Sequence, residues 1–151
     1  MKNLIANNAS KGVTTSIALA ASVLARKYPD GMKVVSGQFA SGEILSGRPS
    51  SEEVVSGDFT VLFDVRGASV GLISDGDPDE CLRRLGCDMV VCATTAHGEM
   101  KYEAAVTTKY GTDVIWAANP IAYDARIAER LNIGYAEFIV KLVEMQVDYF
   151  G

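Results

Sequence analysis

The chain has 151 residues, the size of one domain, and we expect a single domain over residues 1–151 that buries its core without disulfides or metal ions. Hydrophobic residues make up 48% of the chain, and 19 acidic residues against 14 basic ones give a formal net charge of −5. This balance argues against nucleic-acid and anionic-membrane partners, because both need a basic surface. The sequence has no long apolar run and no charged-then-apolar leader, so we expect a cytoplasmic protein.

The first third of the chain predicts a strand, a turn and a helix. Residues 4–6 read as a short buried strand, and apolar residues then recur at helical spacing to about residue 27. Pro29, Asp30 and Gly31 end that helix. The serine- and glycine-rich segment 32–57 is typical of a loop or flap, with brief edge strands at 34–35 and 43–45.

The middle of the chain predicts a hairpin and a central strand. Phe59, Val61, Phe63 and Val65 alternate with other residues at the period of two of a strand. A tight turn at 66–68 leads into residues 70–73, which predicts an antiparallel hairpin. The continuous apolar run 89–93 is typical of a strand covered on both faces, and we expect its cysteine, Cys92, to be a core thiol.

The remaining elements alternate between helices and strands. We expect a short helix at about 78–85, a helix near 99–110, a strand at 114–117 and a C-terminal helix from about 123 to 147 that is interrupted at 132–134. This alternation predicts an α/β three-layer sandwich with a mainly parallel sheet plus the antiparallel hairpin. In such sheets, ligands bind outside the carboxyl ends of the strands.

The turn after the first strand is close to a phosphate-binding loop. Against the pattern G-x-x-x-x-G-K-[ST], Gly12 and Thr14 match, whereas Asn7 replaces the first glycine and Val13 replaces the lysine. Such loops hold an anion with backbone N–H groups at a helix N-terminus. The candidate binding residues for a nucleotide or phosphate are Asn8, Ser10, Lys11, Gly12, Val13, Thr14 and Thr15. The alternative is an ordinary turn in which Ser10 or Thr14 caps the helix.

Further polar residues follow the other strands at the predicted ligand edge. Asp75 and Asp77 come after the hairpin, and Asp75 together with the Thr14 hydroxyl would hold Mg²⁺. His97 follows the central strand and is a candidate general base, so Asp75, Asp77 and His97 are the candidate catalytic residues. The alternatives are a turn in which an aspartate caps the helix at Pro78, and a histidine that is simply exposed or capping.

With these residues in place, the chain resembles the P-loop-containing NTPase-like proteins, and more closely a poorly characterised bacterial group of small single-domain members. In that group the opening motif reads Asn-Lys-Gly-Lys-Thr-Thr. The matching stretches here are Gly-Leu-Ile-Ser-Asp-Gly-Asp-Pro at residues 71–78 and Cys-Asp-Met-Val-Val-Cys-Ala at residues 87–93. The opening stretch Ser-Lys-Gly-Val-Thr-Thr at residues 10–15 departs at Val13, which makes it a degenerate Walker A loop. The resemblance implies phosphate-binding roles for Gly12, Thr14 and Thr15.

Two functions follow from these patterns. The first is a nucleotide- or phosphate-binding protein that takes ATP or GTP with Mg²⁺ and hydrolyses it weakly or not at all, because phosphoryl transfer relies on the missing lysine. The second is a non-catalytic binding or assembly protein that has lost the nucleotide site. The apolar C-terminal stretch either covers the sheet, which is the commoner arrangement, or forms a homodimer contact; its residues are Phe138, Ile139, Leu142, Val143 and Met145.

Overall fold

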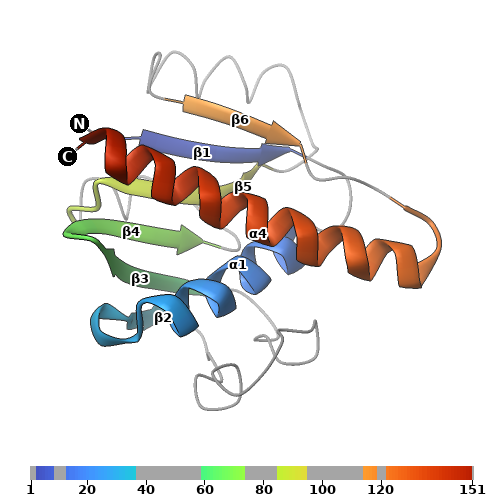
Figure 1. Cartoon of the computed structure of the whole chain (residues 1–151), viewed down its shortest axis with the longest axis horizontal. Helices are drawn as coiled ribbons and strands as arrows, with labels where there is room; N and C mark the ends of the chain where they lie inside the picture. Colours follow the sequence, from blue (N-terminus) through green and yellow to red (C-terminus); the bar gives the residue numbers. More distant parts are fainter. Residues whose placement is uncertain are drawn as a thin grey trace.

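The described elements form an open, mixed β-sheet with two long helices on one face (Figure 1). The computed structural model describes residues 3–8, 13–36, 59–73, 85–94, 114–118 and 122–150. The strands are β1 (Asn3–Asn8), β2 (Lys33–Ser36), β3 (Thr60–Val65), β4 (Ala68–Ile73), β5 (Met89–Thr94) and β6 (Val114–Ala118), in the order β2-β3-β4-β5-β1-β6. The α/β class predicted from the sequence is confirmed.

Strand directions divide the sheet into two parts. β1 pairs in parallel with both β5 and β6, and β4 pairs in parallel with β5. β3 is antiparallel to both β2 and β4, so it alone among the six described strands runs in the opposite direction. β2 lies at one edge of the sheet, and its register with β3 shifts between Val34 and Ser36. The edge strand expected at 34–35 is therefore confirmed.

The β3–β4 hairpin has the geometry that its sequence predicts. A two-residue turn joins the strands, and both of its residues have positive φ, 53° at Arg66 and 91° at Gly67. This backbone matches the right-handed twist of the flanking strands. The carboxylate of Asp64 accepts a hydrogen bond from the backbone N–H of Gly67 at 2.8 Å, which stabilises the turn.

Two long helices pack on one face of the sheet. Helix α1 (Val13–Lys27) ends as predicted and is followed by the short 3₁₀ helix η1 (Pro29–Gly31). Helix α4 (Ala125–Phe150) begins after Asp124, whose carboxylate accepts hydrogen bonds from the backbone N–H groups of Arg126 and Ile127. Asp124 is therefore the N-cap of α4. None of the helices within the described residues is both long and apolar enough to cross a membrane.

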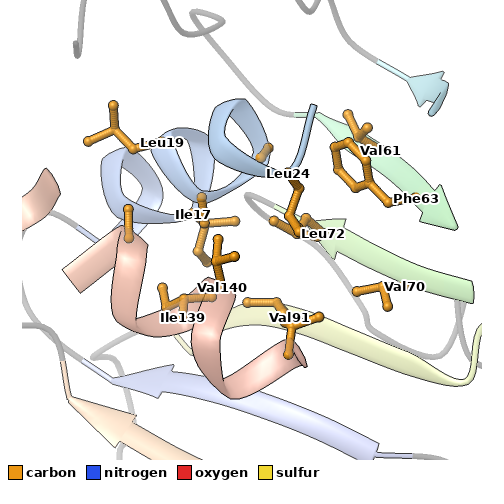
Figure 2. Close-up of a cluster of buried hydrophobic side chains, with 14 of the residues drawn as sticks. Ile17, Leu19, Leu24, Val61, Phe63, Val70, Leu72, Val91, Ile139 and Val140 are labelled. Atoms are coloured by element: carbon orange, nitrogen blue, oxygen red, sulfur yellow. The ribbon is translucent and has the colours of Figure 1, made fainter. Parts of the chain in front are cut away.

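The hydrophobic core lies between these helices and strands β3, β4 and β5 (Figure 2). The predicted alternation holds: Val61, Phe63 and Val65 of β3, and Phe59 just before it, are all buried in this core. Helix α1 contributes a wide apolar surface because most of its side chains from residue 16 to 25 are buried. The other members of the core that Figure 2 labels are Ile17, Leu19, Leu24, Val70, Leu72, Val91, Ile139 and Val140.

The centre of the sheet is also buried on its second face. Met89 and Val91 of β5 belong to the core beneath the helices, whereas Val90 and Cys92 alternate with them and point to the other side. Val90 and Cys92 are nevertheless fully buried. The prediction that residues 89–93 form a strand covered on both faces is therefore confirmed for the side chains at 89–92, and Cys92 is the core thiol that we expected.

One sequence prediction is wrong: α4 is continuous through residues 132–134. Asn132 and Gly134 are poor helix formers, but the residues that follow them, among them Ala136 and Ile139, are buried in the core. Packing of this face outweighs the local preference, because each large apolar side chain contributes about 1.5–3 kcal/mol when buried. The strand expected at 43–45, the helix near 99–110, and all but the last residue of the helix expected at 78–85 lie outside the described residues.

Two glycine substitutions test this packing in opposite directions. A Cβ on Gly31 would overlap the Cβ of Asp64 and lie 3.0 Å from its backbone nitrogen, whereas a Cβ on Gly134 would meet open space. We expect Gly31→Ala to lower the free energy of unfolding by about 1–3 kcal/mol through overpacking. Gly134→Ala should raise it by about 0.5–1 kcal/mol because alanine favours the helix. Urea unfolding followed by circular dichroism measures both, and a destabilised Gly134→Ala variant would contradict a continuous α4.

Candidate functional site

The carboxyl ends of the parallel strands meet at one edge of the sheet. β1 lies between β5 and β6, and its last residue, Asn8, is in register with Thr94 of β5 and Ala118 of β6. β4 ends at the same edge, since Ile73 is in register with Cys92. Ligands of open α/β sheets bind outside this kind of edge.

The segments that carry the predicted site residues all follow strands that end at this edge. Asp75 comes two residues after Ile73, and His97 comes three residues after Thr94. Residues 9–12 join β1 to α1. The strands after which these three segments begin therefore end at the same edge of the sheet, as the sequence predicts. The candidates Ser10, Lys11, Gly12, Asp75, Asp77 and His97 themselves lie outside the described residues.

The remaining candidates lie at the two ends of the β1–α1 connection. Asn8 is the last residue of β1, Val13 is the first residue of α1, and Thr14 and Thr15 belong to the first turn of α1. Thr15 is partly buried. The first turn of α1 contains no acidic residue, so no side-chain carboxylate of its own competes for its backbone N–H groups. These amides and the helix dipole favour a negative charge.

Helix α4 holds this end of α1 in place. The Ser16 hydroxyl, which is fully buried, donates a long hydrogen bond of 3.4 Å to Oδ1 of Asn132 in α4. The next residue, Ile17, is buried in the core. The orientation of the first turn of α1 therefore depends on its packing against α4.

A second polar cluster, the Glu144 network, lies at the opposite end of α1. It consists of Lys27, Tyr28, Arg66, Glu144 and Asp148. Glu144 accepts hydrogen bonds from the Tyr28 hydroxyl at 2.6 Å, from Lys27 at 3.0 Å and from Arg66 at 3.2 Å. Arg66 also contacts both carboxylate oxygens of Asp148, at 2.8 and 2.9 Å. The Glu144 network thus ties the end of α1 and the hairpin turn to α4.

Ionisation in the Glu144 network follows from this geometry. Burial alone would raise the pKa of Glu144, but the hydrogen bonds from Tyr28 and Lys27 and the two nearby cations outweigh it and hold the pKa below its usual range. Burial and the neighbouring Glu144 carboxylate raise the pKa of Tyr28. Glu144 is therefore an anion whose oxygens are occupied by donors. This is the arrangement of a structural ion-pair network rather than of a general base, which must reach a substrate.

Sequence reasoning did not find the Glu144 network. Tyr28 and Glu144 are 116 residues apart, and Arg66 and Glu144 are 78 apart, so no local spacing could reveal them. Within the part of the chain that the structure describes, no three metal-ligating side chains gather into a metal site.

The Glu144 network makes a testable contribution to stability. Glu144→Gln keeps the side-chain volume but removes the charge that Lys27 and Arg66 face, and we expect it to lower the free energy of unfolding at neutral pH by about 1–2 kcal/mol. Because folding lowers the pKa of Glu144, its contribution is present above the unfolded-state pKa and is lost as the pH falls through the folded-state pKa. The difference between wild type and variant should therefore shrink below about pH 4.

Urea unfolding at a series of pH values measures this difference, and Asp148→Asn is the matched control. Asp148 is more exposed than Glu144, and within the Glu144 network it contacts Arg66 but neither Tyr28 nor Lys27. Asp148→Asn should therefore lower the free energy of unfolding much less than Glu144→Gln does. Equal losses in the two variants, or a Glu144→Gln loss that persists in acid, would contradict the assignment of Glu144 as the centre of the Glu144 network.

Comparisons of the chain with protein-family models, with curated proteins and with solved structures find no match.

Proposed function

We propose that the chain binds the phosphate groups of a nucleotide at the connection between β1 and α1. The observation that carries this proposal is the position of β1: it ends at Asn8 between two parallel strands, and α1 begins only five residues later at Val13. A strand, a short loop and a helix N-terminus in this order are the elements from which phosphate-binding loops are built.

The chemistry of the loop residues supports anion binding without strong catalysis. Gly12 allows the backbone to approach an anion closely, and the Thr14 and Thr15 hydroxyls follow it in the first turn of α1. Val13 occupies the place of the lysine that stabilises charge during phosphoryl transfer, and Lys11 is the nearest replacement. We therefore assign binding of ATP or GTP to this loop, with weak or absent hydrolysis.

Magnesium fits the same assignment. Thr14 supplies the hydroxyl and Asp75 the carboxylate that would hold Mg²⁺ beside the phosphates. The segment that carries Asp75 follows β4, whose carboxyl end lies at the same edge as that of β1. Asp77 and His97 follow strands that end there too, and they remain the candidates for any residual catalysis.

The wider architecture that we propose is a three-layer, P-loop-like sandwich. Two features support it: five of the six described strands share one direction, and the central strand β5 is buried on both faces. Parallel sheets of this kind occur with both faces covered.

The second candidate function is a non-catalytic binding or assembly protein. Two observations favour it. Val13 stands where the phosphate-loop pattern has its lysine, and α4 leaves large apolar side chains exposed, Phe138 and Met145 among them. The two candidates differ in nucleotide affinity. A protein that has lost the site should take up no nucleotide, whereas a binding protein without hydrolysis should still do so.

Calorimetric titration with ATP and GTP, each with and without Mg²⁺, tests the first candidate. We expect binding at millimolar nucleotide or below, and a loss of at least about tenfold in affinity for Gly12→Glu, because a side chain and a negative charge enter the anion site. Gly134→Glu is the matched control, since it adds the same side chain on the exposed face of α4. No heat of binding at millimolar nucleotide would favour the assembly protein.

A gain-of-binding variant tests the shape of the loop. Val13→Lys restores the charge of the phosphate-loop pattern, and we expect about a tenfold gain in nucleotide affinity, which corresponds to about 1.4 kcal/mol. Val34→Lys adds the same charge on the edge strand β2 and should leave the affinity unchanged. Equal affinities for Val13→Lys and wild type would mean that the loop does not curl around phosphate.

A further inference from the structure

Helix α4 carries an apolar stripe on the face that points away from the core. The stripe consists of Ile127, Phe138, Met145 and Tyr149, whose exposed fractions lie between 49% and 77%. At 100° per residue, these four positions fall within about 40° of one another around the helix axis. They therefore share one face of α4, with Phe138, Met145 and Tyr149 in its C-terminal half and Ile127 near its start. Figure 1 shows that α4 lies with α1 over one face of the sheet.

The four residues of the stripe are not among the buried residues of the hydrophobic core. The opposite side of α4 already supplies the core with a full set of buried side chains, including Ile139, Val140 and Val143. Single exposed apolar residues are common on protein surfaces, but several large ones on the same face of one helix indicate an interaction site.

Charged side chains run beside the stripe in a regular order. Arg130, Glu137, Lys141 and Asp148 are all exposed and fall within about 40° of one another, directly next to the stripe. Their signs alternate along the helix and are antisymmetric about residue 139. Arg130 and Asp148 lie nine residues to either side of it, and Glu137 and Lys141 lie two residues to either side.

This order makes the surface complementary to itself in one orientation. A two-fold axis perpendicular to α4 reverses the helix direction and brings the charged flank of one helix against the same flank of the other. With the axis at residue 139, Arg130 faces Asp148 of a second copy and Glu137 faces Lys141, and each pair occurs twice. A parallel pair would bring the charged flank against the opposite flank instead.

We propose that a second copy of this chain docks on the α4 stripe, with the two α4 helices antiparallel. This dimer is independent of the proposed nucleotide site, which lies at the carboxyl edge of the sheet. Asp148 keeps its contact with Arg66 within its own chain and still exposes most of its side chain to a partner. A lipid surface fits the stripe poorly, because interfacial helices carry a basic flank and this flank has equal numbers of both signs.

The size of the stripe sets the expected strength of the dimer. A helix of 26 residues is about 39 Å long, and one helix face buries less than the standard interface between proteins. We therefore expect a reversible dimer with a dissociation constant in the micromolar range, on the order of 1–100 µM.

Sedimentation velocity of the full chain over a series of concentrations tests the dimer and its orientation. Lys141→Glu places two acidic side chains opposite each other at both symmetric contacts, and we expect dimerisation to weaken by about tenfold. The double variant Glu137→Lys with Lys141→Glu exchanges the two charges and should recover most of that loss. Lys33→Glu on β2 makes the same change in net charge away from α4 and should dimerise like wild type.

Phe138→Asp provides a second test, since residue 138 lies beside the proposed two-fold axis. We expect this variant to abolish dimerisation, and the side chain that it replaces is about half exposed. Circular dichroism establishes that each variant is folded. A wild type that stays monomeric at about 500 µM, well above the expected dissociation constant, would overturn the proposal. So would a dimer that Phe138→Asp leaves intact, or a double variant that dimerises no better than Lys141→Glu.

Discussion

The burial of α1 between the sheet and α4 is the constraint on which the rest of the structure depends. Its side chains from residue 16 to 22 are all buried, which covers about two full turns of the helix. Small residues make this possible, because Ala18, Ala21 and Ser22 let neighbouring elements approach the helix closely. A helix that is enclosed in this way has little freedom to rotate or slide. Its first turn is therefore fixed beside the carboxyl edge of the sheet, and its last turn is fixed beside the hairpin.

The two ends of α1 carry different kinds of polar chemistry. At the last turn, every strong donor of the Glu144 network meets an acceptor within the chain, so the charges are used for stability. At the first turn, the backbone amides stand at the edge where β1, β4, β5 and β6 end, and no acidic side chain of that turn competes for them. The Glu144 network and the proposed phosphate-binding site are thus separated by the length of one helix, about 22 Å for its 15 residues.

Much of the fold was predictable because its signals are local. The period of two in Phe59, Val61 and Phe63 and the glycine turn at Gly67 specify the hairpin without help from distant residues. The helix break expected at residues 132–134 was wrong. The loss of helix preference at a glycine is about 1 kcal/mol, which is smaller than the free energy gained by burying a whole helix face. The strand order and the Glu144 network join residues far apart in the sequence, so no spacing rule could give them. The candidate loop was predictable in its place between β1 and α1, whereas its binding activity stays a prediction.

The register shift between Val34 and Ser36 has a consequence for how molecules of this chain meet in concentrated solution. An edge strand with regular, unpaired amides is a template for strand addition, the first step of fibril growth. Irregularities of this kind generally increase the local twist of an edge strand, and Lys33 adds a charge to the same short strand. We therefore expect β2 to pair poorly with a strand of another molecule, which disfavours polymerisation through this edge of the sheet.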